Sequence, residues 1–396
     1  MTTPLDDITT TWLRALDEEL PAAAHLRQHL HEDPHVSGEE HQTTQTVLTA
    51  MGIDATPVAG AGAVTRIGPA EGPAVAIRGE LDALPVTEAS GVAWASTNGA
   101  MHACGHDVHL AALTAVVRSA QQVDLPVGLV PVLQPREETY PSGAQDIASS
   151  GLLEQLGVVY AVGAHVHPNV PVGSVATGQG FVNAAAGEIE FVISGRGGHG
   201  AYPHQACDVA VAVAQLVAGI AETVRRTVDP MTPAVVSIGT IQVGTGAANV
   251  LPETGRVLAT VRTTDSQESV RVADALTSFA TSIAAAFGCQ ARTTYTQGEP
   301  ALINDAALVD QTDRALHRVG LDPTEPMRSL GADDFSFYGQ SAPTLMCFVG
   351  VDCAPGTSLH HPRFVPDDGA VSRVARTMVA GYLGAARLIT EQEPTT

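Results

Sequence analysis

The feature that most constrains the fold is a set of three short apolar runs, each followed at once by residues capable of chemistry. They are residues 74–78 before Glu80 and Asp82, residues 127–133 before Glu137 and Glu138, and residues 158–164 before His165. Runs of this length, separated by helical segments, are typical of buried strands in an α/β sheet. Because ligands collect beyond the carboxyl ends of such strands, the sequence predicts a functional site there.

Helical patterns precede and separate the predicted strands. The leucine spacing predicts an amphipathic helix over residues 11–32, and residues 37–40 read as a capping box that begins a second helix. Asp107 is placed to cap a helix over residues 108–122. The histidines around the first two helices match no single helical face, so we expect them at the surface or in packing contacts. They are His25, His29, His31, His35 and His41.

The pattern changes over residues 182–295, where strands alternate with two helices in the order βαββαβ. That order describes a two-layer α+β sandwich with one antiparallel sheet. A chain of 396 residues also exceeds the roughly 250 to 300 residues at which single cores stop growing. We therefore predict one domain from residues 1–181 and 296–396, with a central sheet flanked by helices, and an inserted domain from residues 182–295.

Composition excludes several classes of function. A formal charge of -22 disfavours nucleic acid and anionic membranes as partners. Lysine is absent from the sequence, which removes Schiff-base chemistry and a P-loop. No apolar run approaches the roughly 18 to 20 residues of a membrane span, and the first residues lack a signal-peptide pattern, so we expect a cytoplasmic protein. Five irregularly spaced cysteines predict no disulfide framework.

The densest chemistry lies in residues 101–109, which contain three histidines, a cysteine and an aspartate. Imidazole and thiolate together suit a divalent metal such as zinc, manganese or cobalt. With the strand ends, this stretch offers five candidate ligands, which are too many for one tetrahedral zinc but suit two metals sharing a bridging oxygen. The candidates are Cys104, His106, Glu138, His165 and a histidine at position 360 or 361.

Other residues complete a hydrolytic site. A water between two cations loses its proton near neutral pH, and Glu137 is the candidate general base and acid. Asp82 holds a ligand histidine or the base in place, or alternatively caps a turn at its strand end. Cys104 precedes a helix N-terminus, where a thiolate is favoured, so we interpret it as a ligand and not a nucleophile. His102 and His109 are left with supporting or packing roles.

Six motifs carry a resemblance to a known family, in order over nearly the whole chain. They are RGELDALP at 78–85, MHACGHD at 101–107, QPREE at 134–138, RGGHGAYPH at 196–204, GADDFS at 331–336 and LHHP at 359–362. This set resembles the dinuclear-metal aminoacylase/carboxypeptidase family, and within it amidohydrolases such as hippurate hydrolase and indoleacetyl-amino-acid hydrolases. The resemblance implies a metallopeptidase-like catalytic domain that hydrolyses the amide of an N-acyl amino acid to a carboxylic acid and a free amino acid.

The resemblance also implies roles and cofactors. Two divalent ions, of manganese, zinc, cobalt or nickel, would be held by the five candidate ligands with His360 as the last, and Glu137 would be catalytic. The inserted domain of the family dimerises, which implies a homodimer in which His199 stabilises the oxyanion in a neighbouring subunit. Asn249 and Arg262 match substrate-side positions, although Arg262 could simply pair with acidic neighbours on its sheet.

Three departures from the family pattern concern residues around the site. Glu80 stands where the family branch has aspartate, Asp333 replaces a glutamate, and residues 140–142 replace a glycine-rich stretch. None of them removes a ligand or the base. Three rival interpretations stay open: an aminopeptidase or dipeptidase of the same broad family, a cysteine hydrolase built on Cys104, and a binding protein without catalysis on the same scaffold.

Overall fold

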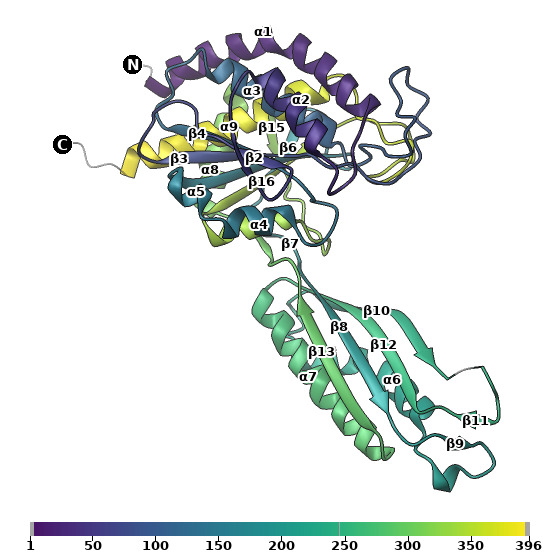
Figure 1. Cartoon of the computed structure of the whole chain (residues 1–396). Helices are drawn as coiled ribbons and strands as arrows, with labels where there is room; N and C mark the ends of the chain where they lie inside the picture. The colour runs from purple at the N-terminus through teal and green to yellow at the C-terminus, as the bar shows by residue number, and fades with distance from the viewer. Residues whose placement is uncertain (1–3, 245, 393–396) are drawn as a thin grey trace. The chain divides into compact units, whose positions relative to one another are not determined.

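A computed structural model describes residues 4–244 and 246–392. These residues form two compact units (Figure 1). The first unit contains Ile303–Arg328, together with the described residues up to Val182 and from Asp334 onward. The second contains Asn183–Leu302 and Ser329–Asp333. It extends past Tyr295 because backbone hydrogen bonds from Gly298 and to Glu299 continue the pairing with Ala186.

The first unit is built on a mixed sheet, whose strands are β1 (Thr56–Val58), β2 (Gly62–Val64), β3 (Ala74–Glu80), β4 (Gly128–Gln134), β5 (Val158–His167), β6 (Ser174–Ala176), β7 (Gly180–Asn183), β14 (Leu302–Asn304), β15 (Asp322–Thr324) and β16 (Thr344–Gly350). The main path runs β1-β2-β4-β3-β5-β16-β14-β7, with β6 beside β16 and β15 beside β6. Strands β4, β3, β5, β16 and β14 are parallel to one another. The predicted α/β class is confirmed, and two strands continue into predicted site residues, Glu80 and His165.

Helices cover both faces of this sheet (Figure 1). They are α1 (Pro4–Glu32), α2 (His41–Met51), α3 (His106–Ala120), α4 (Gly143–Ser149), α5 (Leu152–Gln155), α8 (Ala306–Arg318) and α9 (Ala370–Gln392), with a 3₁₀-helix at Asp334–Gln340. Helix α3 packs against strands β3 and β5 and against helices α1 and α9, and every residue of α3 except Arg118 is buried. The first turn of α3 therefore places His106, Asp107 and His109 inside the molecule.

Both helix caps predicted from the sequence are wrong. Helix α2 begins after Glu40, whose side chain makes no cap hydrogen bond, and α3 begins after Gly105, which leaves Asp107 in the first turn. The predicted capping side chains instead bind groups in other segments, as described below. Gly105 has φ +86°, and a Cβ there would lie 2.4 Å from a methyl group of Val166, so only glycine fits between the two candidate ligands that flank it.

The second unit is a two-layer sandwich, made of β8 (Ala185–Ser194), β9 (Gly198–His199), α6 (Val209–Thr227), β10 (Ala234–Val243), β11 (Val250–Leu251), β12 (Thr254–Thr263), α7 (Ser266–Ala286) and β13 (Gln290–Gln297), with a 3₁₀-helix at Pro203–Gln205. Its antiparallel sheet has the order β10-β12-β8-β13, and β9 pairs with β11 outside it. Helices α6 and α7 pack on one face. Alternation along β12 buries Val257, Ala259 and Val261 beneath the helices and leaves Arg256 and Arg262 on the open face.

No helix in the described part of the chain is both long enough and apolar enough to cross a membrane.

Candidate metal centre

Two histidines of the first unit present their Nε2 atoms to the same buried space. Nδ1 of His106 lies 2.8 Å from the carbonyl oxygen of Asp82, and Nδ1 of His165 lies 2.8 Å from that of Val166. A carbonyl only accepts, so each Nδ1 carries a proton, and in the neutral ring Nε2 is the nitrogen with the lone pair. Among the described residues, Nε2 of His106 has no hydrogen-bond partner although it is buried. Both rings are thus oriented as metal ligands are.

A thiol and a carboxylate converge on these nitrogens. Sγ of Cys104 lies 3.5 Å from Nε2 of His165. Ligand atoms of Cys104, His106 and Glu138 all lie within 4.8 Å of one another. His360 joins them, because its Nε2 lies 3.2 Å from Oε1 of Glu138. The neighbouring His361 instead accepts a hydrogen bond from the backbone N–H of Arg363, so of the two histidines it is His360 that faces the cluster.

The helix N-terminus led us to expect a favoured thiolate at Cys104, but the surroundings of Cys104 favour the protonated thiol. Burial, and then the carboxylates of Glu138 and Glu137, raise the pKa of the Cys104 thiol well above its usual value. The thiol therefore keeps its proton unless a cation lies beside it. A protonated buried thiol is a poor nucleophile, which argues against the cysteine-hydrolase interpretation and agrees with a ligand that ionises when it binds metal.

Asp82 organises the turn that carries the paired glutamates. Its Oδ1 accepts the backbone N–H of Glu137 at 3.1 Å, and its Oδ2 accepts that of Glu138 at 2.9 Å. Oδ2 also accepts the hydroxyl of Ser37 at 2.7 Å. Asp82 is fully buried, so these bonds hold both backbone amides in one orientation. Oε2 of Glu137 then lies 3.8 Å from Nε2 of His106, beside the predicted ligands.

The segment predicted as a capping box supports the same turn. Glu40 is fully buried, and its Oε1 accepts the backbone N–H of Arg136 at 2.8 Å. Arg136 has φ +53°, a conformation that non-glycine residues rarely adopt. His360 shares this property with φ +66°. Strained backbone of this kind is held in place by its surroundings and clusters at functional sites. Sequence reasoning missed the role of Glu40, because its pattern matched a cap.

A second cluster, Glu80 with His109, lies against the predicted ligands. Ligand atoms of these two residues, His106 and His165 lie within 4.8 Å of one another. Nε2 of His109, however, accepts the backbone N–H of Val166 at 3.0 Å, so its Nδ1 carries the proton and donates to Oε2 of Glu80 at 3.0 Å. His109 has no lone pair left for a metal.

Glu80 itself stays charged. Burial raises its pKa, but Arg78, at 2.8 Å, and His109 outweigh burial and hold the pKa well below its usual value. The carboxylate therefore adds negative charge beside the cluster. Glu80, which departs from the family pattern, has both carboxylate oxygens engaged, one by Arg78 and the other by His109.

The described residues fit a pair of divalent metals. Thiolate, imidazole and carboxylate are ligands that such ions accept, and a bound cation would give the buried Nε2 of His106 a partner and offset the carboxylate charge beside the Cys104 thiol. A mixed α/β sheet with this donor set at the carboxyl ends of its strands defines a metallohydrolase of the dinuclear class.

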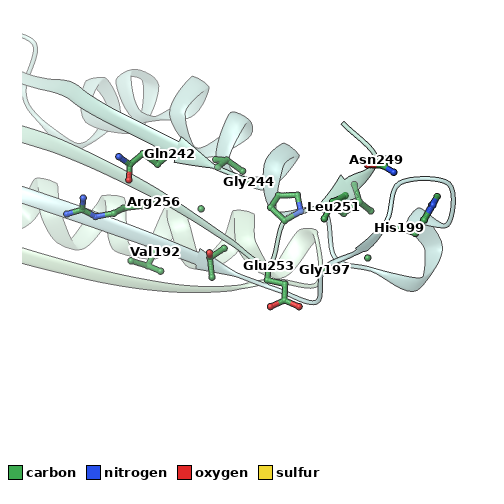
Figure 2. A pocket seen from close by; sticks show the side chains of 15 residues that line it. Val192, Gly197, His199, Gln242, Gly244, Asn249, Leu251, Glu253 and Arg256 are labelled. Atoms are coloured by element: carbon green, nitrogen blue, oxygen red, sulfur yellow. The ribbon is translucent and has the colours of Figure 1, made fainter. Parts of the chain in front are cut away.

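The predicted substrate residues lie in the second unit. His199 and Asn249 line a groove of about 990 Å³, together with Gln242, Glu253 and Arg256 (Figure 2). Pairing of His199 with Val250, and a hydrogen bond from Gly200 N–H to the carbonyl of Asn249, hold the first two residues side by side. Arg262 does not line this groove. Its Nη1 is buried and has no hydrogen-bond partner in the described part of the chain.

Comparison with known proteins agrees with this class. Residues 76–381 match Peptidase family M20/M25/M40. An N-acetyl-L-cysteine deacetylase of Bacillus subtilis (strain 168) is 34% identical over 376 residues, which are 93% of this chain and 88% of that protein. An N-acetyldiaminopimelate deacetylase of Halalkalibacterium halodurans is 32% identical over 373 residues, 92% of this chain and 99% of that protein.

A solved structure extends the likeness to three dimensions. The Bacillus subtilis YXEP protein, a dinuclear metal binding peptidase from the M20 family, matches with a TM-score of 0.81 at 29% identity, covering 93% of this chain and 98% of that chain. The chain belongs to Peptidase family M20/M25/M40, in its amidohydrolase branch. It is a hydrolase that acts on amide bonds, and the family and the dinuclear neighbour support two divalent metals.

Proposed function

We propose that the protein removes the acyl group of an N-acyl amino acid and releases a carboxylic acid and a free amino acid. The convergence of Cys104, His106 and Glu138, with a buried unpartnered nitrogen on the histidine, is the observation that carries this proposal. The names of the relatives, deacetylases of N-acetylcysteine and N-acetyldiaminopimelate, support the substrate class. The ligands of the metal pair are Cys104, His106, Glu138, His165 and His360.

The metal pair, of manganese, zinc, cobalt or nickel, lowers the pKa of a water and polarises the scissile carbonyl when it is bound. Glu137 accepts the proton of the attacking water and delivers it to the leaving nitrogen. Asp82 keeps Glu137 and Glu138 in place through their backbone amides. This division of labour needs no nucleophilic side chain, so Cys104 serves only as a ligand.

Substrate recognition uses the open face of the second unit. We assign the free α-carboxylate to Arg262, because a guanidinium binds a carboxylate through two parallel hydrogen bonds and Nη1 has no protein partner among the described residues. His199 and Asn249 lie in the groove beyond the other end of β12. Arg256 of that groove is six residues from Arg262, or about 20 Å along a strand at roughly 3.3 Å per residue.

That separation is too large for one small substrate to contact both ends within one chain. We therefore infer a homodimer in which His199 and Asn249 of one subunit complete the site of the other, where His199 stabilises the oxyanion. The placement of Arg262 and of the groove toward opposite ends of strand β12 supports this arrangement.

Turnover on a panel of acetyl, benzoyl, succinyl and indoleacetyl amino acids, with metal analysis alongside, tests the proposal. We expect release of the amino acid, loss of activity with a chelator and recovery with one of the four metals. Free-amine dipeptides form the comparison set. Hydrolysis of dipeptides alone would establish the aminopeptidase alternative, and a protein that holds two metals but cleaves neither set would contradict both.

A further inference from the structure

Two cations at the end of α1 bind one carboxylate beside the candidate metal centre. Nε of Arg27 lies 3.2 Å from Oδ2 of Asp107, and Nδ1 of His31 lies 3.0 Å from the same oxygen. All three side chains are buried. Asp107 directly follows His106 in the first turn of α3. The end of α1 is thus attached to the backbone that carries two of the proposed ligands, Cys104 and His106.

Arg27 also holds the segment that follows His360. Its Nη2 donates to the carbonyl of Pro366 at 2.6 Å, and its Nη1 donates to that of Asp367 at 3.2 Å. One guanidinium therefore joins three segments that are far apart in the sequence. Its planar fork of donors makes this geometry specific, since a lysine in the same place has only one nitrogen.

His31 makes the second connection, through Glu88. Its Nε2 lies 3.1 Å from Oε1 of Glu88, whose other oxygen accepts the backbone N–H of Ser96 at 2.6 Å. The ring of Trp94, in the same loop, contacts His31 edge-on at 4.7 Å and lies 5.3 Å from the guanidinium of Arg27. Ala89, which follows Glu88 in the chain, donates its N–H to the carbonyl of Pro362 at 2.7 Å. The loop with Glu88 and Trp94 is therefore hydrogen-bonded to the segment that contains His360.

The four charged groups balance one another. Burial lowers the pKa of His31, but Asp107 and Glu88 outweigh burial and raise it to about 9, so the ring is an imidazolium at neutral pH. The cluster then contains two cations and two anions. Buried ion pairs contribute little net stability compared with apolar side chains of the same volume. Contact between α1 and α3 is already secured far from the centre by Trp12, whose Nε1 donates to Ser119 Oγ at 2.9 Å.

We propose that Arg27 and His31 are positioning residues of the metal centre, which hold the start of α3 and the segment of His360 at a fixed separation. The inference rests on the ligand roles of the proposed function and adds to them two residues outside the ligand set. Asp107, Glu88 and Trp94 are the partners through which both cations act.

Arg27→Lys and His31→Gln, alone and combined, test this inference, with Trp12→Phe as the matched control on the same two helices. Metal affinity is measured by chelator competition with Co²⁺ and Zn²⁺ in the absence of substrate, and thermal unfolding is measured on metal-free protein. We expect both single variants to lose about tenfold or more in affinity, with a changed visible spectrum of the Co²⁺ protein. At saturating metal, kcat falls and KM is retained. Trp12→Phe lowers the unfolding temperature only.

Wild-type affinity in both single variants, with unfolding temperatures lowered as in the control, would show a structural role and overturn the proposal. The two variants change different contacts, so if one does not fold, the other decides. Because the affinity readout needs no substrate, it stays decisive if no N-acyl amino acid is cleaved. A wild-type protein that binds no metal refutes the ligand assignment, and with it both proposals.

Discussion

Glu137 and Glu138 are neighbours in the chain, but they have different partners. Burial raises the pKa of Glu138, while a hydrogen bond from His360 and the charges of His106 and His360 outweigh burial and lower it, as suits a ligand carboxylate. We predict that Glu137→Gln reduces kcat about a hundredfold to ten-thousandfold, the range of general acid–base catalysis, and keeps both metals. Glu138→Gln should lose metal. Metal content and kcat, measured on the same samples, check this, and the reverse pattern would exchange the two roles.

His31 predicts a pH dependence of stability in the alkaline range. Its pKa rises from 6.5 to about 9 on folding, because Asp107 and Glu88 face its two nitrogens and outweigh burial and the nearby Arg27. A raised pKa stabilises the folded state fully below pH 6.5 and less as pH rises through 9. At about 1.4 kcal/mol per pKa unit, the loss is on the order of 3 kcal/mol.

Urea unfolding between pH 6 and 10 measures this dependence. The free energy of unfolding of the wild type should decrease over that interval relative to His31→Gln, which lacks the titrating group. Parallel curves for the two proteins would mean that folding does not raise the pKa of His31.

At the scale of elements, the sequence predicts strands better than helix caps. Apolar runs determine β3, β4 and β5, because burial on both faces leaves few other arrangements for such segments. The predicted caps fail for a different reason. Ser37, Glu40 and Asp107 have the side chains of capping residues, but they bind partners 45, 96 and 80 positions away. A local pattern carries no information about such distant partners.

The turn after β4 offers a test of positioning by one carboxylate. Asp82→Asn removes the charge and leaves one acceptor oxygen for the two backbone amides of Glu137 and Glu138, so both glutamates lose their fixed orientation. We expect activity or metal affinity to fall about tenfold to a hundredfold. Ser37→Ala, which deletes only the hydroxyl contact to Asp82, is the matched control and should cost less. Equal losses in the two variants would place the effect in Ser37 and not in the turn.

At the scale of the whole molecule, the sequence predicts the class of the site but not the contacts that hold the ligands in place. Candidate ligands are recognisable because imidazole, thiolate and carboxylate groups stand at strand ends. The sequence does not show whether His360 or His361 is the ligand. The backbone conformation decides which of the two adjacent side chains faces the cluster, and the φ of +66° at His360 depends on tertiary contacts. Likewise, the spacing of Glu80 and His109 in the sequence does not predict the hydrogen bond between their side chains.

The position of His199 makes a prediction about subunit assembly. If His199 completes a neighbouring site, a mixture of His199→Ala and Glu137→Gln proteins should regain activity after subunit exchange. In each mixed dimer, one site combines an intact Glu137 with the partner's intact His199, and the other site lacks both.

Random exchange of two subunits in a symmetric dimer gives mixed dimers as about half of the population, so about a quarter of the sites become active. Activity per site, measured after exchange is confirmed by mass spectrometry, checks this expectation. Separately purified variants give the baseline. Action of His199 within its own chain predicts no recovery at all, because every chain in the mixture then lacks one of the two residues. Recovery near one quarter of wild-type turnover therefore distinguishes a shared site from two independent ones.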